Sequence, residues 1–170
     1  HILEGITAGV RHRRELRRLV EAALPAQGRV LDREPLLLAK GGVRALALDF
    51  DGVLAPHGAD CPLPEVVNWL QRAVAVFGEE KIVILSNRPS GPRVTWFASN
   101  FPGVRFVTGV RKKPYPDGLI KTGELVGAPL SVVLMADDRL LTGCLAALLA
   151  RARRWYLHRP YVAFCSNFLT

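Results

Sequence analysis

The sequence predicts an α/β fold, a three-layer Rossmann-like domain with a central, mainly parallel five-stranded sheet. Short runs rich in β-branched residues alternate along the chain with segments of helical length and pattern, and these runs are almost continuously apolar. Strands that are apolar on both faces are typical of parallel sheets covered by helices on each side. At 170 residues, the chain is long enough for one such domain.

The first expected element is a basic amphipathic helix at 11–24, where apolar residues recur at helical spacing and arginines fill the positions between them. Pro25 ends this helix, so we expect an N-terminal helix and connector at 1–35 followed by the core domain at 36–170. Two arrangements are open for the helix. It packs on the domain with its basic face in water, or it lies on an anionic membrane.

Five strands are expected in the core domain. They cover residues 43–49, 81–86, 104–110, 131–136 and 154–158. Ligands of open parallel sheets bind at the carboxyl ends of the strands, where the following loops meet at one edge. The residues after each strand are therefore the first candidates for a functional site.

Charged and polar side chains follow these strands in a consistent way. They are Asp49 and Asp51 after the first strand, Ser86, Asn87 and Arg88 after the second, Lys113 after the third, and Asp137 and Asp138 after the fourth. Several carboxylates at one edge repel one another unless a divalent cation lies among them, and such hard oxygen ligands suit Mg²⁺. A lysine and a hydroxyl at the same edge provide what a phosphoryl group needs. The set indicates Mg²⁺-dependent phosphoryl transfer.

Two aspartates one residue apart can divide the steps of such a reaction. One carboxylate attacks phosphorus to form an aspartyl phosphate, and the other protonates the leaving oxygen and later activates water. Gly52 lets the chain turn sharply after them and, with Asn87 and Arg88, is a candidate substrate contact. The stretch also fits a strand followed by an Asp-Gly turn with no chemistry attached. His57 is either a substrate contact or an exposed loop histidine.

The order of these strand ends resembles the haloacid dehalogenase (HAD) superfamily of Mg²⁺-dependent phosphatases over about residues 36–162. The matching motifs are D-x-D-x-[TV] at 49–53, the hydroxyl residue Ser86, Lys113 before Pro114, and the acidic pair Asp137 and Asp138. The resemblance implies that Asp49 is the nucleophile and Asp51 the general acid and base. It also implies that Ser86 and Lys113 hold the phosphoryl group, and that Mg²⁺ is bound by Asp49, the backbone carbonyl of Asp51 and an aspartate of the last motif.

A narrower match is to the YqeG branch, capless phosphatases related to phosphatidylglycerophosphate phosphatase. It rests on GGVRALALDFDGVL, ILSNRPSGPRV, VRKKP and DDRLLTG. Only about 30 residues separate the first two strands, so no sizeable cap fits between them. The branch implies an open site and favours a phospholipid phosphate such as phosphatidylglycerophosphate. The alternatives are a phosphatase of a soluble sugar or nucleotide phosphate, and a non-catalytic HAD-fold binding module.

The fourth motif departs from the branch pattern. Aligned on the LLT sequence, Asp138 stands at the usual Asp and Gly143 stands where a second Asp is usual. Asp138 is therefore the better candidate ligand for the metal, and Asp137 replaces the missing acid by the acidic-pair version of the motif.

Composition restricts the partners. The formal net charge of +8 lies mainly in the last third of the chain and favours phosphate esters or anionic lipid surfaces. Nucleic acid is not expected, because the three tryptophans lie in helix or strand patterns, which are more typical of core residues than of a base-stacking face. Three scattered cysteines predict reduced thiols in a cytoplasmic protein, peripheral on the inner face of a membrane if the substrate is a lipid. The apolar run at 161–170 is expected to lead into further natural sequence.

Overall fold

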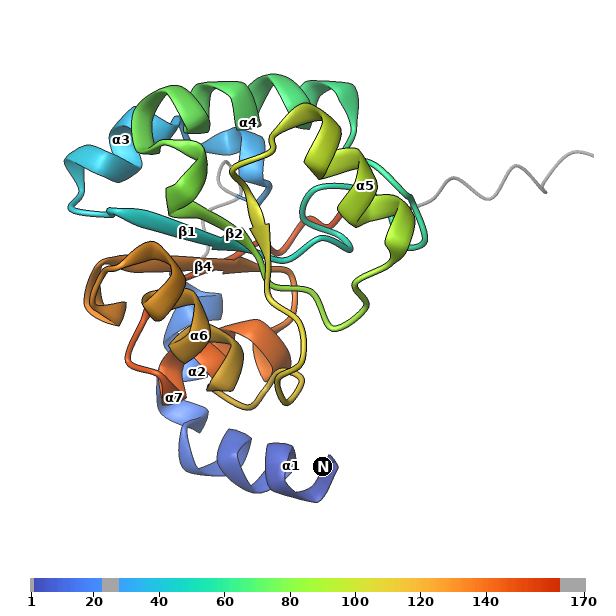
Figure 1. Cartoon of the computed structure of the whole chain (residues 1–170). Coiled ribbons are helices and arrows are strands. Elements are labelled where there is room, and N and C mark those ends of the chain that lie inside the picture. The colour runs from blue at the N-terminus through green and yellow to red at the C-terminus, as the bar shows by residue number, and fades with distance from the viewer. Residues whose placement is uncertain (1, 23–27, 163–170) are drawn as a thin grey trace, which may run out of the picture.

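A computed structural model describes residues 2–22 and 28–162 of the chain (Figure 1). Its strands are β1 (Ala45–Leu48), β2 (Ile82–Ile84), β3 (Arg105–Phe106), β4 (Val133–Asp137) and β5 (Arg153–Tyr156). They form a parallel sheet in the order β3-β2-β1-β4-β5. Each observed strand overlaps its predicted range. The predicted fold class, a Rossmann-like domain with a parallel five-stranded sheet, is confirmed.

Helices cover both faces of the sheet, which gives the three layers seen in Figure 1. On one face lie α3 (Pro35–Lys40), α4 (Pro64–Phe77) and α5 (Gly91–Asn100), and on the other lie α6 (Asp117–Val126), α7 (Leu145–Leu149) and α2 (Arg13–Glu21). The short helical turns are η2 (Val30–Asp32), η3 (Glu79–Lys81), η4 (Leu130–Val132) and the π-helical η5 (Leu140–Cys144). Local sequence sets several ends: α4 begins at a proline, and Ser90 caps α5 by accepting from the Arg93 N–H.

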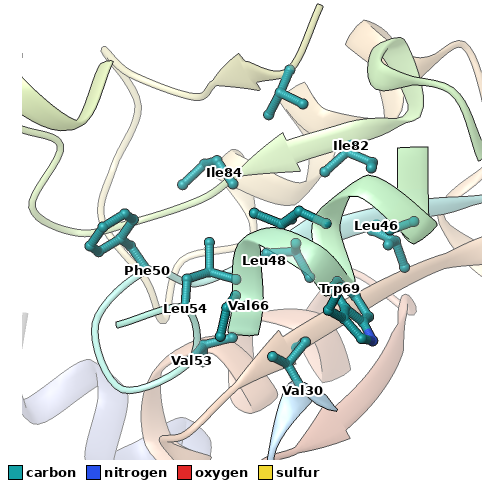
Figure 2. Packing of buried hydrophobic residues seen from close by; sticks show 14 of the residues in the cluster. Val30, Leu46, Leu48, Phe50, Val53, Leu54, Val66, Trp69, Ile82 and Ile84 are labelled. Atoms are coloured by element: carbon teal, nitrogen blue, oxygen red, sulfur yellow. The ribbon is translucent and has the colours of Figure 1, made fainter. Parts of the chain in front are cut away.

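The central strand β1 is buried on both faces, which explains its unbroken apolar sequence. Leu46 and Leu48 pack with Trp69 beneath α3 and α4 (Figure 2). Ala45 and Ala47 belong to the core on the opposite face. All four side chains of β1 are fully buried. The residues directly after β1 are therefore attached to a rigid, buried strand.

The N-terminal segment differs from its prediction. Instead of one helix at 11–24, the chain forms α1 (Ile2–Arg11) and α2, broken at His12. The break lets Ala8 on α1 and Leu16 on α2 pack against one cluster with Cys144 and Leu145. Leu16 is buried while the arginines of α2 are exposed, so this helix packs on the domain with its basic face in water.

Two further points concern the N-terminal segment and the helices as a whole. The expected stop at Pro25 lies outside the described residues. Within 2–22 and 28–162, no helix combines the length and apolar character needed to cross a membrane.

Candidate active site

The sheet register brings the predicted site residues to one edge. Leu48 of β1 pairs with Ile84 of β2 and with Ala136 of β4, so the residues that follow these strands lie side by side. The Asp49 N–H donates to the Ala136 carbonyl at 3.0 Å, which fixes Asp49 beside the end of β4. A small pocket of about 50 Å³ opens here. It is lined by Asp49, Asp51, His57, Ser86, Asn87, Arg88, Lys113, Arg139 and Thr142.

Three carboxylates meet beneath this pocket: Asp49, Asp137 and Asp138, here called the acidic cluster. Each offers an oxygen that lies within 4.8 Å of the others. Lys113 Nζ lies 3.0 Å from Asp49 Oδ1 and 2.5 Å from Asp137 Oδ2, and its side chain is only 3% exposed. One ammonium thus faces three carboxylates.

The electrostatics of the acidic cluster follow from this imbalance. Burial raises the pKa of Asp49 to about 6, and the Asp137 charge adds to that rise while Lys113 opposes it. Burial acts to lower the pKa of Lys113, but Asp49 and Asp137 outweigh it and hold that pKa above its ordinary value. Lys113 therefore stays charged, and the ionised cluster carries more negative charge than Lys113 neutralises.

Asp137 and Asp138 differ in how their oxygens are used. Asp137 is fully buried; its Oδ2 accepts from Lys113, and its Oδ1 accepts from the Arg139 N–H at 2.8 Å and from Thr142 Oγ1 at 3.4 Å. Asp138 Oδ1 is buried without a hydrogen-bond partner among the described residues, and Arg139 Nε is 4.0 Å away. Burial and then the Asp137 charge raise the pKa of Asp138. Asp138 has the oxygen available for a further ligand.

Gly143 stands where the resemblance places a second aspartate, and the structure gives the reason. A Cβ at Gly143 would collide with the carboxylate of Asp137. Asp137 occupies the space that a side chain at position 143 would need. Position 143 therefore accepts no side chain unless Asp137 moves.

Asp51 lies outside the acidic cluster and has a partner of its own. Arg93 Nη2 donates to Asp51 Oδ1 at 2.8 Å and Arg93 Nη1 donates to Asp51 Oδ2 at 3.0 Å. The Gly58 N–H adds a longer bond of 3.3 Å to Oδ1. Burial acts to raise the pKa of Asp51, but the Arg93 bonds outweigh it and hold that pKa below its ordinary value.

The segment after β2 supplies the polar wall of the pocket. The Ser86 side chain is buried, and its Oγ accepts from the Arg88 N–H at 3.1 Å. The Asn87 side chain makes two hydrogen bonds to the Lys113 backbone. Its Nδ2 donates to the Lys113 carbonyl at 3.1 Å, and its Oδ1 accepts from the Lys113 N–H at 2.8 Å. Asn87 thus holds the lysine loop, while the exposed Arg88 lies at the pocket mouth.

Gly52 provides space next to the acidic cluster. Its φ is +80°, and a Cβ there would collide with Asp138 Oδ2. Its N–H donates to the Ala55 carbonyl at 2.7 Å, so that group closes the turn after Asp51. At the mouth, His57 Nε2 lies 3.4 Å from Arg139 Nη2.

Sequence reasoning missed Arg139 and Thr142, which line the pocket. It also missed Arg93, the partner of Asp51. The Arg93 side chain is buried on α5, four residues before the buried Phe97. An arginine in register with the apolar face of a helix is the signal that could have found it, because a buried guanidinium needs an acidic partner.

The residues of the acidic cluster fit a hard divalent cation such as Mg²⁺. The oxygens of Asp49 and Asp138 are close together, one Asp138 oxygen has no hydrogen-bond partner within residues 2–22 and 28–162, and the cluster is more negative than Lys113 can neutralise. Mg²⁺ is bound in proteins through one or two carboxylates and water, which this set allows. The donors are all oxygen, with no sulfur among the three residues.

Comparisons with known proteins bear on the fold. No known protein-family model and no curated protein matches the chain. A solved crystal structure of an uncharacterized protein from Corynebacterium glutamicum is similar, with a TM-score of 0.52 and 23% identity, over 67% of this chain and 84% of that chain. This likeness agrees with the Rossmann-like architecture and extends no further than the fold.

Proposed function

We propose that the chain is a Mg²⁺-dependent phosphomonoester hydrolase of the HAD superfamily that works through an aspartyl-phosphate intermediate. The observation that carries the proposal is the position of Asp49. It directly follows the central strand, lines the pocket, and lies beside Lys113 and the other two carboxylates of the acidic cluster. A rigid sheet holds a nucleophile here next to a fixed positive charge, as phosphoryl transfer requires.

In the first half of the proposed reaction, an oxygen of Asp49 attacks phosphorus and the bond to the leaving oxygen breaks. Lys113 and the Ser86 hydroxyl bind the equatorial phosphoryl oxygens, since both line the pocket beside Asp49. The proton that the leaving oxygen needs comes from Asp51, which accepts it from water in the preceding turnover. The products are a free alcohol and the aspartyl phosphate.

In the second half, water attacks phosphorus of the aspartyl phosphate and Asp51 accepts its proton, which releases inorganic phosphate and restores Asp49. Arg93 favours the ionised form of Asp51, the form that this step uses. A Mg²⁺ ion held by Asp49, Asp138 and the Asp51 carbonyl would supply neutralisation of the phosphoryl charge.

The favoured substrate within this proposal is a phospholipid phosphate such as phosphatidylglycerophosphate. Two observations support it. The described loop from Asp49 to the start of α4 at Pro64 contains no cap, so the pocket mouth stays open to a large substrate. Exposed Ile6 and Val10 on α1 and exposed Leu141 after the acidic pair accompany the arginines of α2, a combination suited to an anionic lipid surface.

Phosphate release tests this proposal. Phosphatidylglycerophosphate in mixed micelles and a soluble aryl phosphate are each assayed with and without Mg²⁺, using Asp49→Asn as the control. We expect release from the lipid that needs both Mg²⁺ and Asp49. Release from the aryl ester alone removes the lipid from the proposal. Release from neither substrate contradicts catalysis and favours the binding-module alternative.

A further inference from the structure

Arg93 is a buried arginine placed at the junction of two site loops. It lies in the first turn of α5 and is 4% exposed. Besides the two bonds to Asp51, its Nε donates to the Ala59 carbonyl at 2.9 Å and its Nη1 donates to the Arg88 carbonyl at 3.1 Å. The guanidinium carbon lies 4.0 Å from the centre of the Phe50 ring. One side chain thus connects the loop after β1 to the loop after β2.

This bonding pattern leaves Arg93 little capacity to bind a substrate. Bonds to described residues engage all three nitrogens of its guanidinium, and Arg93 is not among the residues that line the pocket. Asp51, its partner, does line the pocket. Any effect of Arg93 on chemistry must therefore pass through Asp51 or through the two loops.

We propose that Arg93 is a positioning residue, which fixes the direction of the Asp51 carboxylate toward the reacting atoms. This inference rests on the proposed phosphatase function. The planar guanidinium meets both Asp51 oxygens at once, so the carboxylate cannot rotate freely about its last bond. Small displacements of a group that transfers protons cost large factors in rate.

The geometry requires arginine rather than lysine. The guanidinium reaches Asp51, Ala59 and Arg88 from a fixed plane, whereas an ammonium is a single point charge on a flexible stem. Arg93→Lys keeps the charge and the approximate length but not the fork. This variant therefore distinguishes a role of Arg93 in orienting the Asp51 carboxylate from a role in neutralising its charge.

A double-mutant cycle in phosphate release tests the inference. Wild type, Arg93→Met, Arg93→Lys, Asp51→Asn and Asp51→Asn/Arg93→Met are compared at saturating Mg²⁺. We expect Arg93→Met to lower kcat by about 100-fold, the effect of misplacing a catalytic group, with KM changed by less than about threefold. Arg93→Lys regains no more than about a tenth of wild-type kcat. The double variant is no slower than Asp51→Asn, because Arg93 acts through Asp51.

A matched control comes from a surface pair of the same type. Arg72 Nε on α4 lies 3.1 Å from Glu34 Oε2, and both side chains are about half exposed. Arg72→Met should leave kcat and KM within about twofold of wild type, because exposed ion pairs contribute little. Thermal unfolding of every variant separates loss of fold from loss of rate.

Several results would overturn the inference. They are an Arg93 effect that adds in full to that of Asp51→Asn, an effect on KM alone, or a fully active Arg93→Lys. If Arg93→Met does not fold, the cycle is run with Arg93→Lys and decides in the same way. A wild type that releases no phosphate defeats the proposed function and this inference together, whereas an active wild type with an additive cycle defeats this inference alone.

Discussion

Asp49 and Asp51 are separated only by Phe50, yet they lie in opposite electrostatic surroundings. Asp49 shares one lysine with Asp137, and burial raises its pKa to about 6. Asp51 has an arginine to itself, which holds its pKa below the ordinary value against the effect of burial. The first carboxylate belongs to a group with excess negative charge, and the second to a balanced pair.

The difference teaches how one strand end can position two unlike acids. Asp49 lies against β4, where further carboxylates end the neighbouring strand, while Asp51 begins the loop that meets α5. The acidic cluster shares the Lys113 ammonium among three carboxylates, whereas the Asp51 carboxylate has the Arg93 guanidinium to itself.

The largest effect is expected from removing Lys113, the buried lysine that contacts the acidic cluster. Lys113→Met should lower the free energy of unfolding without Mg²⁺ by about 3–5 kcal/mol, because it leaves buried carboxylates uncompensated. Lys112→Met, at the exposed neighbouring position, should change it by less than about 0.5 kcal/mol. Urea unfolding measures both. Equal values for the two variants would contradict the contrast.

Next in size is the glycine that leaves room for Asp138. Gly52 and Gly58 have nearly the same φ, +80° and +85°, but a Cβ at Gly52 would collide with Asp138 while one at Gly58 meets nothing within 4 Å. Both alanine variants carry the same backbone strain, so the collision alone should make Gly52→Ala less stable than Gly58→Ala by about 1–3 kcal/mol. Chemical denaturation measures the free energy of unfolding of both variants. Equal losses of stability would contradict a steric role of Gly52.

A smaller effect distinguishes the two neighbouring carboxylates. Asp138→Asn should raise the Mg²⁺ concentration for half-maximal stabilisation by about tenfold, because it alters the oxygen that lacks a partner. Asp137→Asn should shift that concentration less, since both Asp137 oxygens already accept hydrogen bonds within the protein. Thermal unfolding at a series of Mg²⁺ concentrations measures the half-maximal concentration for each variant. The reverse order would assign the metal contact to Asp137.

The smallest effect is the pH dependence of Mg²⁺ stabilisation. The folded pKa of Asp49, about 6, is above its ordinary 3.8, so the folded state holds a proton that the unfolded state has lost between these pH values. Stability without metal therefore falls as pH rises through this window and is constant above it. Mg²⁺ should raise Tm by a few degrees at pH 7.5 and by less than about one degree at pH 4.5. An Asp49→Asn protein should lose most of this difference.

Sequence reasoning predicts the parts of the site that depend on strand ends. Asp49, Ser86 and Lys113 could be placed together because a parallel sheet brings its carboxyl ends to one edge. Arg93 could not, since its partner lies 42 residues away, on the far side of α4 and β2 in the sequence, and no local pattern specifies how these elements pack. The role of Gly143 likewise depends on the side-chain position of Asp137.

The secondary-structure elements likewise include some that the sequence predicts and one break that it does not. The apolar strands were predictable from composition, because burial on both faces requires it. The break at His12 was not, because the single amphipathic pattern of 11–24 does not contain Ala8, which packs in the same cluster as Leu16. Local periodicity predicts a helix but does not tell where tertiary contacts bend it.

The strand order also has a consequence for how the molecule folds. One neighbour of β1 is β2, the next strand in the sequence. Its other neighbour is β4, whose residues are made much later during synthesis. Pairings between distant segments form slowly, because loop closure must precede them. We therefore expect Asp137 and Asp138 to meet Asp49 only once β4 pairs with β1, so the repulsion among the three carboxylates should oppose that pairing rather than the earlier one between β1 and β2.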